Sequence, residues 1–215
     1  MRLLEKTTLL AVLGPIAPLV GFLACWWGTF AWLPEKMVRN TALSGLAVGL
    51  LAAAVFLRGW MRRGFSFSWK AWAGIYLFYA VGTFGFFMGM PVFNLALVLP
   101  AGVIVGGRLA RQVLEAGQVR RLIHGAQIYT TSVLAALCLC SATLALAYQD
   151  TGAELQAMFH LGFRLTRMHL VGLIVFGGSA LLLLHWFLLA AVVYRSLRRH
   201  QRAERPEFHS GAGAG

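Results

Sequence analysis

Long runs of apolar residues, separated by short polar stretches, dominate the pattern along this chain. Each run has close to the roughly 20 residues that an α-helix needs to cross hydrocarbon about 30 Å thick. Runs such as residues 181–184, all leucine, do not alternate with polar residues, which disfavours a transmembrane β-barrel. The pattern therefore predicts an all-α, polytopic membrane protein with six transmembrane helices, at residues 8–30, 41–57, 71–90, 91–107, 125–148 and 169–194.

The composition agrees with this class, because 59% of the 215 residues are hydrophobic and only 12% are charged. Soluble domains are typically about 45–50% apolar and about 25% charged. So little charge cannot cover a folded surface in water, which excludes a soluble globular domain, and a disordered chain and a disulfide-stapled module are excluded as well. We expect a single transmembrane domain over residues 1–205 and a flexible C-terminal tail over residues 206–215.

The basic residues predict the orientation of the chain. It carries 19 Lys and Arg and a net charge of +12. With the N-terminus inside, all but four of the 19 fall in inner segments, and the outer four are Lys36, Arg39, Arg164 and Arg167. Because Lys and Arg accumulate in cytoplasmic loops, we expect both termini in the cytoplasm and the protein in the cell inner membrane.

The same charge distribution bears on partners. A basic cytoplasmic face attracts anionic lipid by about 1 kcal/mol for each basic residue near the surface. We therefore expect membrane lipids as partners, with anionic lipid at the basic face, and no nucleic acid. A homo-oligomer and a larger membrane complex both stay open as protein assemblies.

Glycine pairs predict where helices approach one another closely. Two glycines four residues apart lie on one face of a helix and let two backbones come together in lipid. Three consecutive spans each contain such a pair, which are Gly45 with Gly49, Gly85 with Gly89, and Gly102 with Gly106.

Prolines predict breaks in two spans. Pro15 and Pro18 remove N–H donors near the start of the first span, which predicts a kink there. The third and fourth spans are joined almost without a loop, and Pro100 interrupts the short fourth span. A short hydrophobic segment broken by proline is typical of binding sites in transporters. Asn94 lies in this segment, which makes it the leading candidate for a binding residue.

A candidate ligand site is expected around Asn94. Thr83 and Asn94 would supply hydrogen bonds to the ligand. The walls of the site would be Tyr79, Trp26 and Phe93, and His185 would lie deeper as an ionisable residue. An ionisable group inside a membrane, as His185 is here, is a functional hypothesis by default. The structural alternatives are that Asn94 bonds the adjoining turn or a neighbouring helix, and that His185 is a neutral histidine bonded to another helix.

Three further segments carry expectations. His124, Gln127 and Thr131 share a face of the fifth span, as the inner mouth of a polar path or simply as its wet end. Residues 153–168 have the periodicity of an amphipathic helix on the outer surface. Residues 109–114 predict a short surface helix at the inner side, which Gly117 would end.

The residues that usually carry chemistry do not form a catalytic or metal pattern. All seven acidic residues fall in terminal or connecting segments. Cys138 and Cys140 are two residues apart, so on a helix they point away from each other and cannot share a metal or a disulfide. His169 and His185 lie about 24 Å apart along one helix, too far to ligate one haem. We therefore expect no metal and no cofactor, and an enzyme is not the favoured class.

Two functional classes remain. Six spans, broken helices and few charges in the membrane favour a transport or channel component that handles a small solute. The alternative is a non-catalytic accessory or scaffold subunit of a larger membrane complex, which needs no site.

Overall fold

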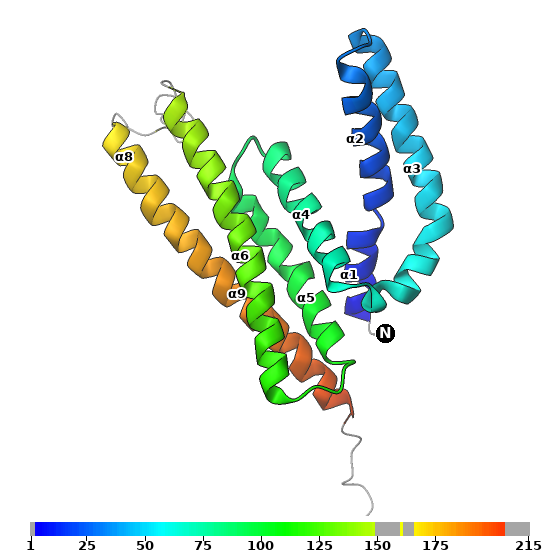
Figure 1. Cartoon of the computed structure of the whole chain (residues 1–215), viewed down its shortest axis with the longest axis vertical. Helices are drawn as coiled ribbons and strands as arrows, with labels where there is room; N and C mark the ends of the chain where they lie inside the picture. The colour runs from blue at the N-terminus through cyan, green and yellow to red at the C-terminus, as the bar shows by residue number, and fades with distance from the viewer. Residues whose placement is uncertain (1–2, 149–159, 161–165, 205–215) are drawn as a thin grey trace, which may run out of the picture. The chain divides into compact units, whose positions relative to one another are not determined.

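The computed structural model describes residues 3–148, 160 and 166–204, and all secondary structure among them is helical (Figure 1). Five helical stretches of this part are long and apolar enough to cross a membrane. They are Leu3–Phe30, Glu35–Ser66, Pro91–Leu109, Ala116–Ala147 and Arg167–Gln201. The all-α class expected from the sequence is therefore confirmed, and the long apolar helices are compatible with a multi-pass membrane protein.

The first of two compact units, Met1–Phe67, consists of α1 (Leu3–Leu13), α2 (Ile16–Phe30), α3 (Glu35–Arg63) and the short 3₁₀ helix η1 (Gly64–Ser66). Both α1 and α2 pack against α3. The helix breaks between α1 and α2 at Gly14 and Pro15, as the prolines predicted. Pro18 lies in the first turn of α2, where its missing N–H is not needed.

The second unit, Ser68–Gly215, carries the remaining helices. In chain order they are α4 (Trp69–Phe86), the 3₁₀ helix η2 (Pro91–Leu97), α5 (Val98–Leu109), α6 (Ala116–Ala147), α8 (Arg167–Gly172), the π-helix η3 (Leu173–Gly177) and α9 (Gly178–Glu204). Helices α8, η3 and α9 follow one another without a break and form one long rod (Figure 1). Whether the two units make up the single domain expected from the sequence stays a prediction.

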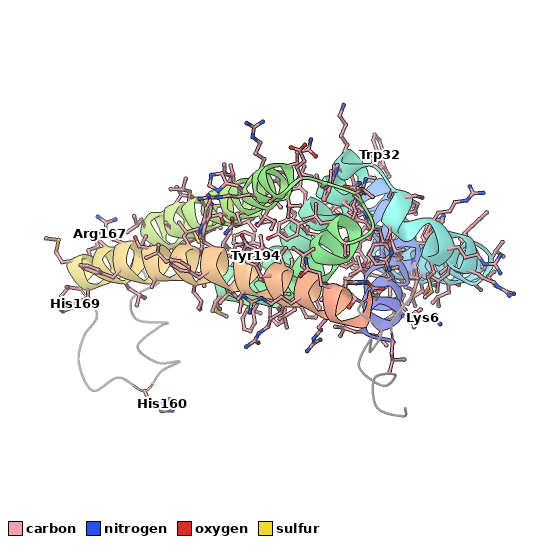
Figure 2. All side chains as sticks on the ribbon, turned by 90° about the horizontal axis from the view of Figure 1, so that it is seen from below. Lys6, Trp32, His160, Arg167, His169 and Tyr194 are labelled. Atoms are coloured by element: carbon pink, nitrogen blue, oxygen red, sulfur yellow. The ribbon has the colours of Figure 1, made fainter. Side chains whose placement is uncertain are left out.

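Side-chain caps fix two helix starts in the second unit. The Ser68 hydroxyl accepts a hydrogen bond from the Ala71 N–H at 3.1 Å and so begins α4. Thr166 and His169 cap the start of α8 reciprocally, each bonding the other's backbone N–H. Figure 2 shows Arg167 and His169 at this first turn and Tyr194 farther along the same rod.

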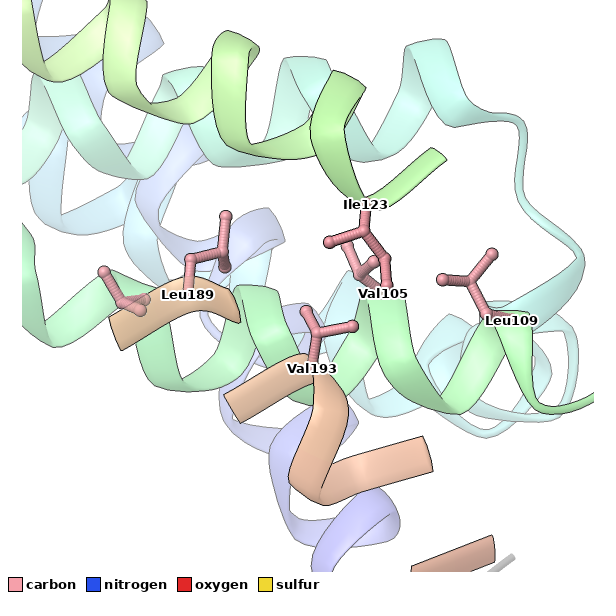
Figure 3. Close-up of a cluster of buried hydrophobic side chains, with 6 residues drawn as sticks. Val105, Leu109, Ile123, Leu189 and Val193 are labelled. Carbon is pink, nitrogen blue, oxygen red and sulfur yellow. The ribbon is translucent and has the colours of Figure 1, made fainter. Parts of the chain in front are cut away.

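A hydrophobic cluster joins α5, α6 and α9. Its buried members are Val98, Val105, Leu109, Ile123, Leu189 and Val193. Figure 3 shows the side chains from the three helices converging on one another. Apolar burial alone does not bring helices together in lipid, so close packing of this kind supplies van der Waals contact.

Two of the three glycine pairs lie in close helix contacts. A Cβ built on Gly102 would lie 2.6 Å from Val192 Cγ1, and one on Gly106 would lie 2.6 Å from Ser196 Cβ. In the first unit, a Cβ on Gly45 would lie 2.5 Å from the sulfur of Cys25, which belongs to α2. These contacts exclude larger side chains, and the pairs on α5 and α3 behave as the sequence predicted.

The prediction for the third pair, Gly85 with Gly89, is wrong. A Cβ on Gly85 would meet no described atom within 4 Å outside its own neighbourhood. The helix ends at Phe86, and Gly89 has a φ of +80° in the turn that follows. Gly89 therefore serves the turn, because glycine adopts this left-handed conformation without strain.

The structure changes two other segments. The surface helix expected over residues 109–114 is absent, because α5 ends at Leu109 and residues 110–115 form turns and extended chain. Gly117 lies in the first turn of α6, which begins at Ala116 and not at the start of the apolar run. The amphipathic helix expected over 153–168 and the tail over 206–215 fall mainly or wholly outside the described residues.

One end of the second unit collects basic residues. Helix α4 runs away from this end, and η2 and α5 return to it. The loop from α5 to α6 lies at the same end, so the start of α4, the end of α5 and the start of α6 bring their basic residues together. This basic end carries Lys70, Arg108, Arg120, Arg121, Arg195, Arg198 and Arg199. The guanidinium carbon of Arg108 lies 4.4 Å from the centre of the Trp69 ring, in cation–π geometry.

Candidate functional site

The candidate site starts from Asn94 in η2. Pro91 opens this 3₁₀ segment, and Pro100 falls in the first turn of α5, where no N–H is needed. The interruption expected at Pro100 is therefore wrong: η2 continues into α5 after Leu97, and only the helix type changes, from 3₁₀ to α. The Asn94 side chain is only 1% exposed, and neither its Oδ1 nor its Nδ2 has a hydrogen-bond partner in the described part of the chain.

His185 in α9 is the second buried polar residue. Its side chain is 0% exposed, and neither ring nitrogen is hydrogen-bonded to any described residue. It precedes Trp186, whose carbonyl accepts a hydrogen bond of 3.2 Å from the Gln127 side-chain amide of α6. The Trp186 ring also meets His124 edge to face, with 5.3 Å between ring centres. These contacts fix α6 against α9 directly beside His185.

Thr131 in α6 is the third polar residue of this region, and it lies one turn beyond Gln127. Its hydroxyl is buried and makes no hydrogen bond within the described residues. The adjoining Thr130 hydroxyl, in contrast, donates to the carbonyl of Ala126 at 3.0 Å. The two threonines are neighbours in sequence, but only Thr130 satisfies its hydroxyl on its own helix.

The residues expected on α4 lie beside η2, because α4 packs against both η2 and α6. Thr83 and Tyr79 are one turn apart and half-buried on α4. The Tyr129 hydroxyl of α6 donates to the Ala73 carbonyl of α4 at 2.8 Å, which fixes these two helices together. The structure therefore brings Thr83, Tyr79 and Asn94 into adjoining elements of the second unit.

The two remaining wall residues have other surroundings. Phe93 is 39% exposed and stacks on Phe87 across the turn between α4 and η2, with 4.0 Å between ring centres. Trp26 belongs to the first unit, where its ring stacks on Phe22 of the same helix. Phe93 therefore stacks on another ring at the turn, and Trp26 stacks on another ring within α2.

Thr131 is the binding candidate that the sequence-based site omitted. The sequence placed Thr131 on one face with His124 and Gln127, but it did not show that the Thr131 hydroxyl is buried without a bond to its own helix. We refer to these three residues, Asn94, Thr131 and His185, as the polar level. They offer an amide, a hydroxyl and an imidazole, which together can donate and accept several hydrogen bonds.

Metal ligands do not gather in the described part of the chain: no group of three or more His, Cys, Asp or Glu residues is placed to hold an ion. The three cysteines, Cys25, Cys138 and Cys140, are free thiols. Comparisons with known protein families, with curated protein sequences and with solved structures give no match for this chain.

Proposed function

We propose that this protein is a six-span protein of the cell inner membrane, with both termini in the cytoplasm, that carries a small solute across the membrane. The observation that carries the proposal is the Asn94 amide, which is 1% exposed and has no described partner, in a span that begins as a 3₁₀ helix. A buried amide without a partner is unfavourable in lipid. Irregular backbone at this depth is tolerated where it faces protein or a water-filled cavity, as it does in transporters.

The sixth span of this proposal is α4. Its 18 residues extend about 27 Å at 1.5 Å per residue, close to the thickness of the hydrocarbon. Aromatic residues and Lys70 lower its hydropathy, which explains its absence from the five most apolar stretches. It packs against α6, which is one of those five.

The basic end of the second unit supports the proposed orientation. Four chain segments bring Lys and Arg to this end. Near the opposite end of the unit, Arg167 is the one Lys or Arg among the described residues. The positive-inside rule places the basic end in the cytoplasm. Helix α9 ends with Glu204 at the same end, and anionic lipid headgroups are the partners that the charge favours.

Transport is tested with the purified protein reconstituted into vesicles. Uptake of isotope-labelled glycerol, acetamide, choline and aspartate is compared with uptake by protein-free vesicles. We expect faster uptake of at least one solute, and loss of this gain in Asn94→Leu. Uptake equal to that of empty vesicles for all four solutes contradicts the proposal. If the solubilised protein then copurifies with a stoichiometric membrane partner, the accessory-subunit hypothesis replaces it.

A further inference from the structure

We propose that the polar level, formed by Asn94, Thr131 and His185, is a hydrogen-bonding site for a small uncharged solute that carries both donor and acceptor groups. This inference rests on the proposed transport function and names its substrate class. It also assigns a binding role to Thr131.

The three residues lie at the same height in the second unit. Val98 and Leu189 both belong to the hydrophobic cluster. Asn94 lies four residues before Val98, and His185 lies four residues before Leu189, on segments that both run toward the basic end. The contacts of Gly102 with Val192 and of Gly106 with Ser196 show that α5 and α9 run parallel.

The third helix reaches this height from the opposite direction. On α6, which runs away from the basic end, Gln127 bonds the Trp186 carbonyl, and Thr131 follows four residues later. Helix α6 packs against both η2 and α9. Thr131 is therefore on a helix that contacts both the segment carrying Asn94 and the helix carrying His185.

The polar atoms at this height are costly without partners. Leaving a buried donor or acceptor unsatisfied costs its full desolvation free energy, whereas an apolar residue of similar size avoids the cost. Gln127, one turn nearer the basic end, and Thr130, the residue before Thr131, both have partners. Unpaired polar atoms on three helices at one height indicate a place where a molecule supplies the missing bonds.

The surroundings select against charge. The segments 71–86, 91–107, 122–147 and 170–194 contain no Asp, Glu, Lys or Arg. A charged solute would lose its hydration here without a fixed countercharge, which is strongly unfavourable in a membrane. An amide, a hydroxyl and an imidazole instead match a neutral molecule, such as a polyol or a small amide, that donates and accepts at once.

The flux experiment uses reconstituted vesicles and matched threonine variants. We expect uptake of glycerol or acetamide above the protein-free level and none for choline or aspartate. Asn94→Leu and Thr131→Val each remove a bonding group and should lower this uptake about three- to tenfold. Thr130→Val is the control: it removes the neighbouring hydroxyl, which is already bonded within α6, and should leave the uptake unchanged.

A second readout measures binding independently of transport. With ¹⁵N-labelled histidine, the imidazole resonances of His185, assigned through His185→Gln, should shift when glycerol or acetamide is added to the detergent-solubilised protein. A shift without uptake of any solute supports the site and contradicts the transport function. Uptake restricted to choline or aspartate supports transport and overturns this inference. Unchanged His185 resonances with both uncharged probes overturn it as well.

Discussion

At the residue scale, two buried side-chain amides in the described part of the second unit are in opposite situations. Gln127 donates to the Trp186 carbonyl and so links α6 to α9, whereas the Asn94 amide has no described partner. Hydrogen bonds between helices stabilise a membrane protein modestly, and an unpaired buried amide destabilises it. The same functional group therefore has opposite effects on the free energy of unfolding at these two positions.

Replacing the two amides separates their roles. Asn94→Leu should unfold in detergent at the wild-type temperature or above it, because an apolar side chain removes a desolvation cost without breaking a bond. Gln127→Leu should lower the free energy of unfolding by about 0.5–1.5 kcal/mol, since it deletes an interhelical hydrogen bond. Thermal unfolding measures both. A lower melting temperature for Asn94→Leu than for Gln127→Leu would show that Asn94 is held by the protein.

Arg108 is a largely buried charged residue that contacts an aromatic ring. Only 9% of it is exposed, and its guanidinium lies over the Trp69 ring. The contact joins the end of α5 to the start of α4 at the basic end, so a cation is retained there within the packed helices.

Removing the aromatic ring tests this contact. Trp69→Leu should lower the free energy of unfolding by at least about 0.5–2 kcal/mol, through the lost cation–π interaction together with reduced packing against the hydrophobic cluster. Trp32→Leu is the control, because Trp32 is 85% exposed and its loss should leave stability unchanged. Equal melting temperatures for the two variants would argue against a contribution from the Arg108 contact.

At the scale of elements, close packing depends on which neighbour faces a glycine. Gly102 and Gly106 face α9 at distances that admit no Cβ, while Gly85 faces open space. The spacing of four residues is the same in the pairs on α3 and α5 and in Gly85 with Gly89, so spacing alone does not identify a contact. The end of α4 at Phe86 removes Gly89 from the helix altogether.

Leucine substitutions should reproduce this difference. Gly102→Leu and Gly106→Leu should destabilise the protein by about 1–3 kcal/mol or more, because the new side chain overlaps Val192 or Ser196. Gly85→Leu and Gly74→Leu should be tolerated, since neither position has a described neighbour within 4 Å. Melting temperatures in one detergent give the comparison. Similar losses for all four variants would contradict the packing of α5 against α9.

Two segments depart from α-helical geometry in the second unit. The 3₁₀ helix η2 is accounted for by Pro91 and Pro100, which restrict the backbone on either side of it. The π-helix η3 adjoins Gly172 and ends at Gly177, and glycine weakens the preference for regular helix. The prolines indicated irregular helix at η2, whereas the glycines did not predict the π-helix η3.

At the scale of the whole molecule, charge is segregated along the second unit. Helices that run in opposite directions nevertheless place their basic residues at one end. This arrangement is what the positive-inside rule requires of a protein inserted in one orientation.

Reporter fusions test the orientation. Green fluorescent protein fused to the C-terminus should be fluorescent, and alkaline phosphatase at the same position should be inactive, because the C-terminus is expected in the cytoplasm. Alkaline phosphatase fused after Tyr148 should be active. An active phosphatase at the C-terminus would contradict both the six spans and the charge argument.

The sequence alone determined the all-α class with long apolar helices and the break before α2, whereas the interruption expected at Pro100 is not present. The first two features follow from hydropathy and from missing N–H donors, which act on each segment by itself. The six spans and the orientation are predictions of the same kind that await the fusion experiments.

Tertiary structure decided which local patterns became contacts. It placed Gly102 against Val192 but left Gly85 without a neighbour, and it began α6 at Ala116, well before the apolar run. It also left the Thr131 hydroxyl without a bond to a described residue, whereas the adjoining Thr130 hydroxyl bonds its own helix. Packing and hydrogen bonding depend on what the facing helix presents, and that information lies tens of residues away along the chain.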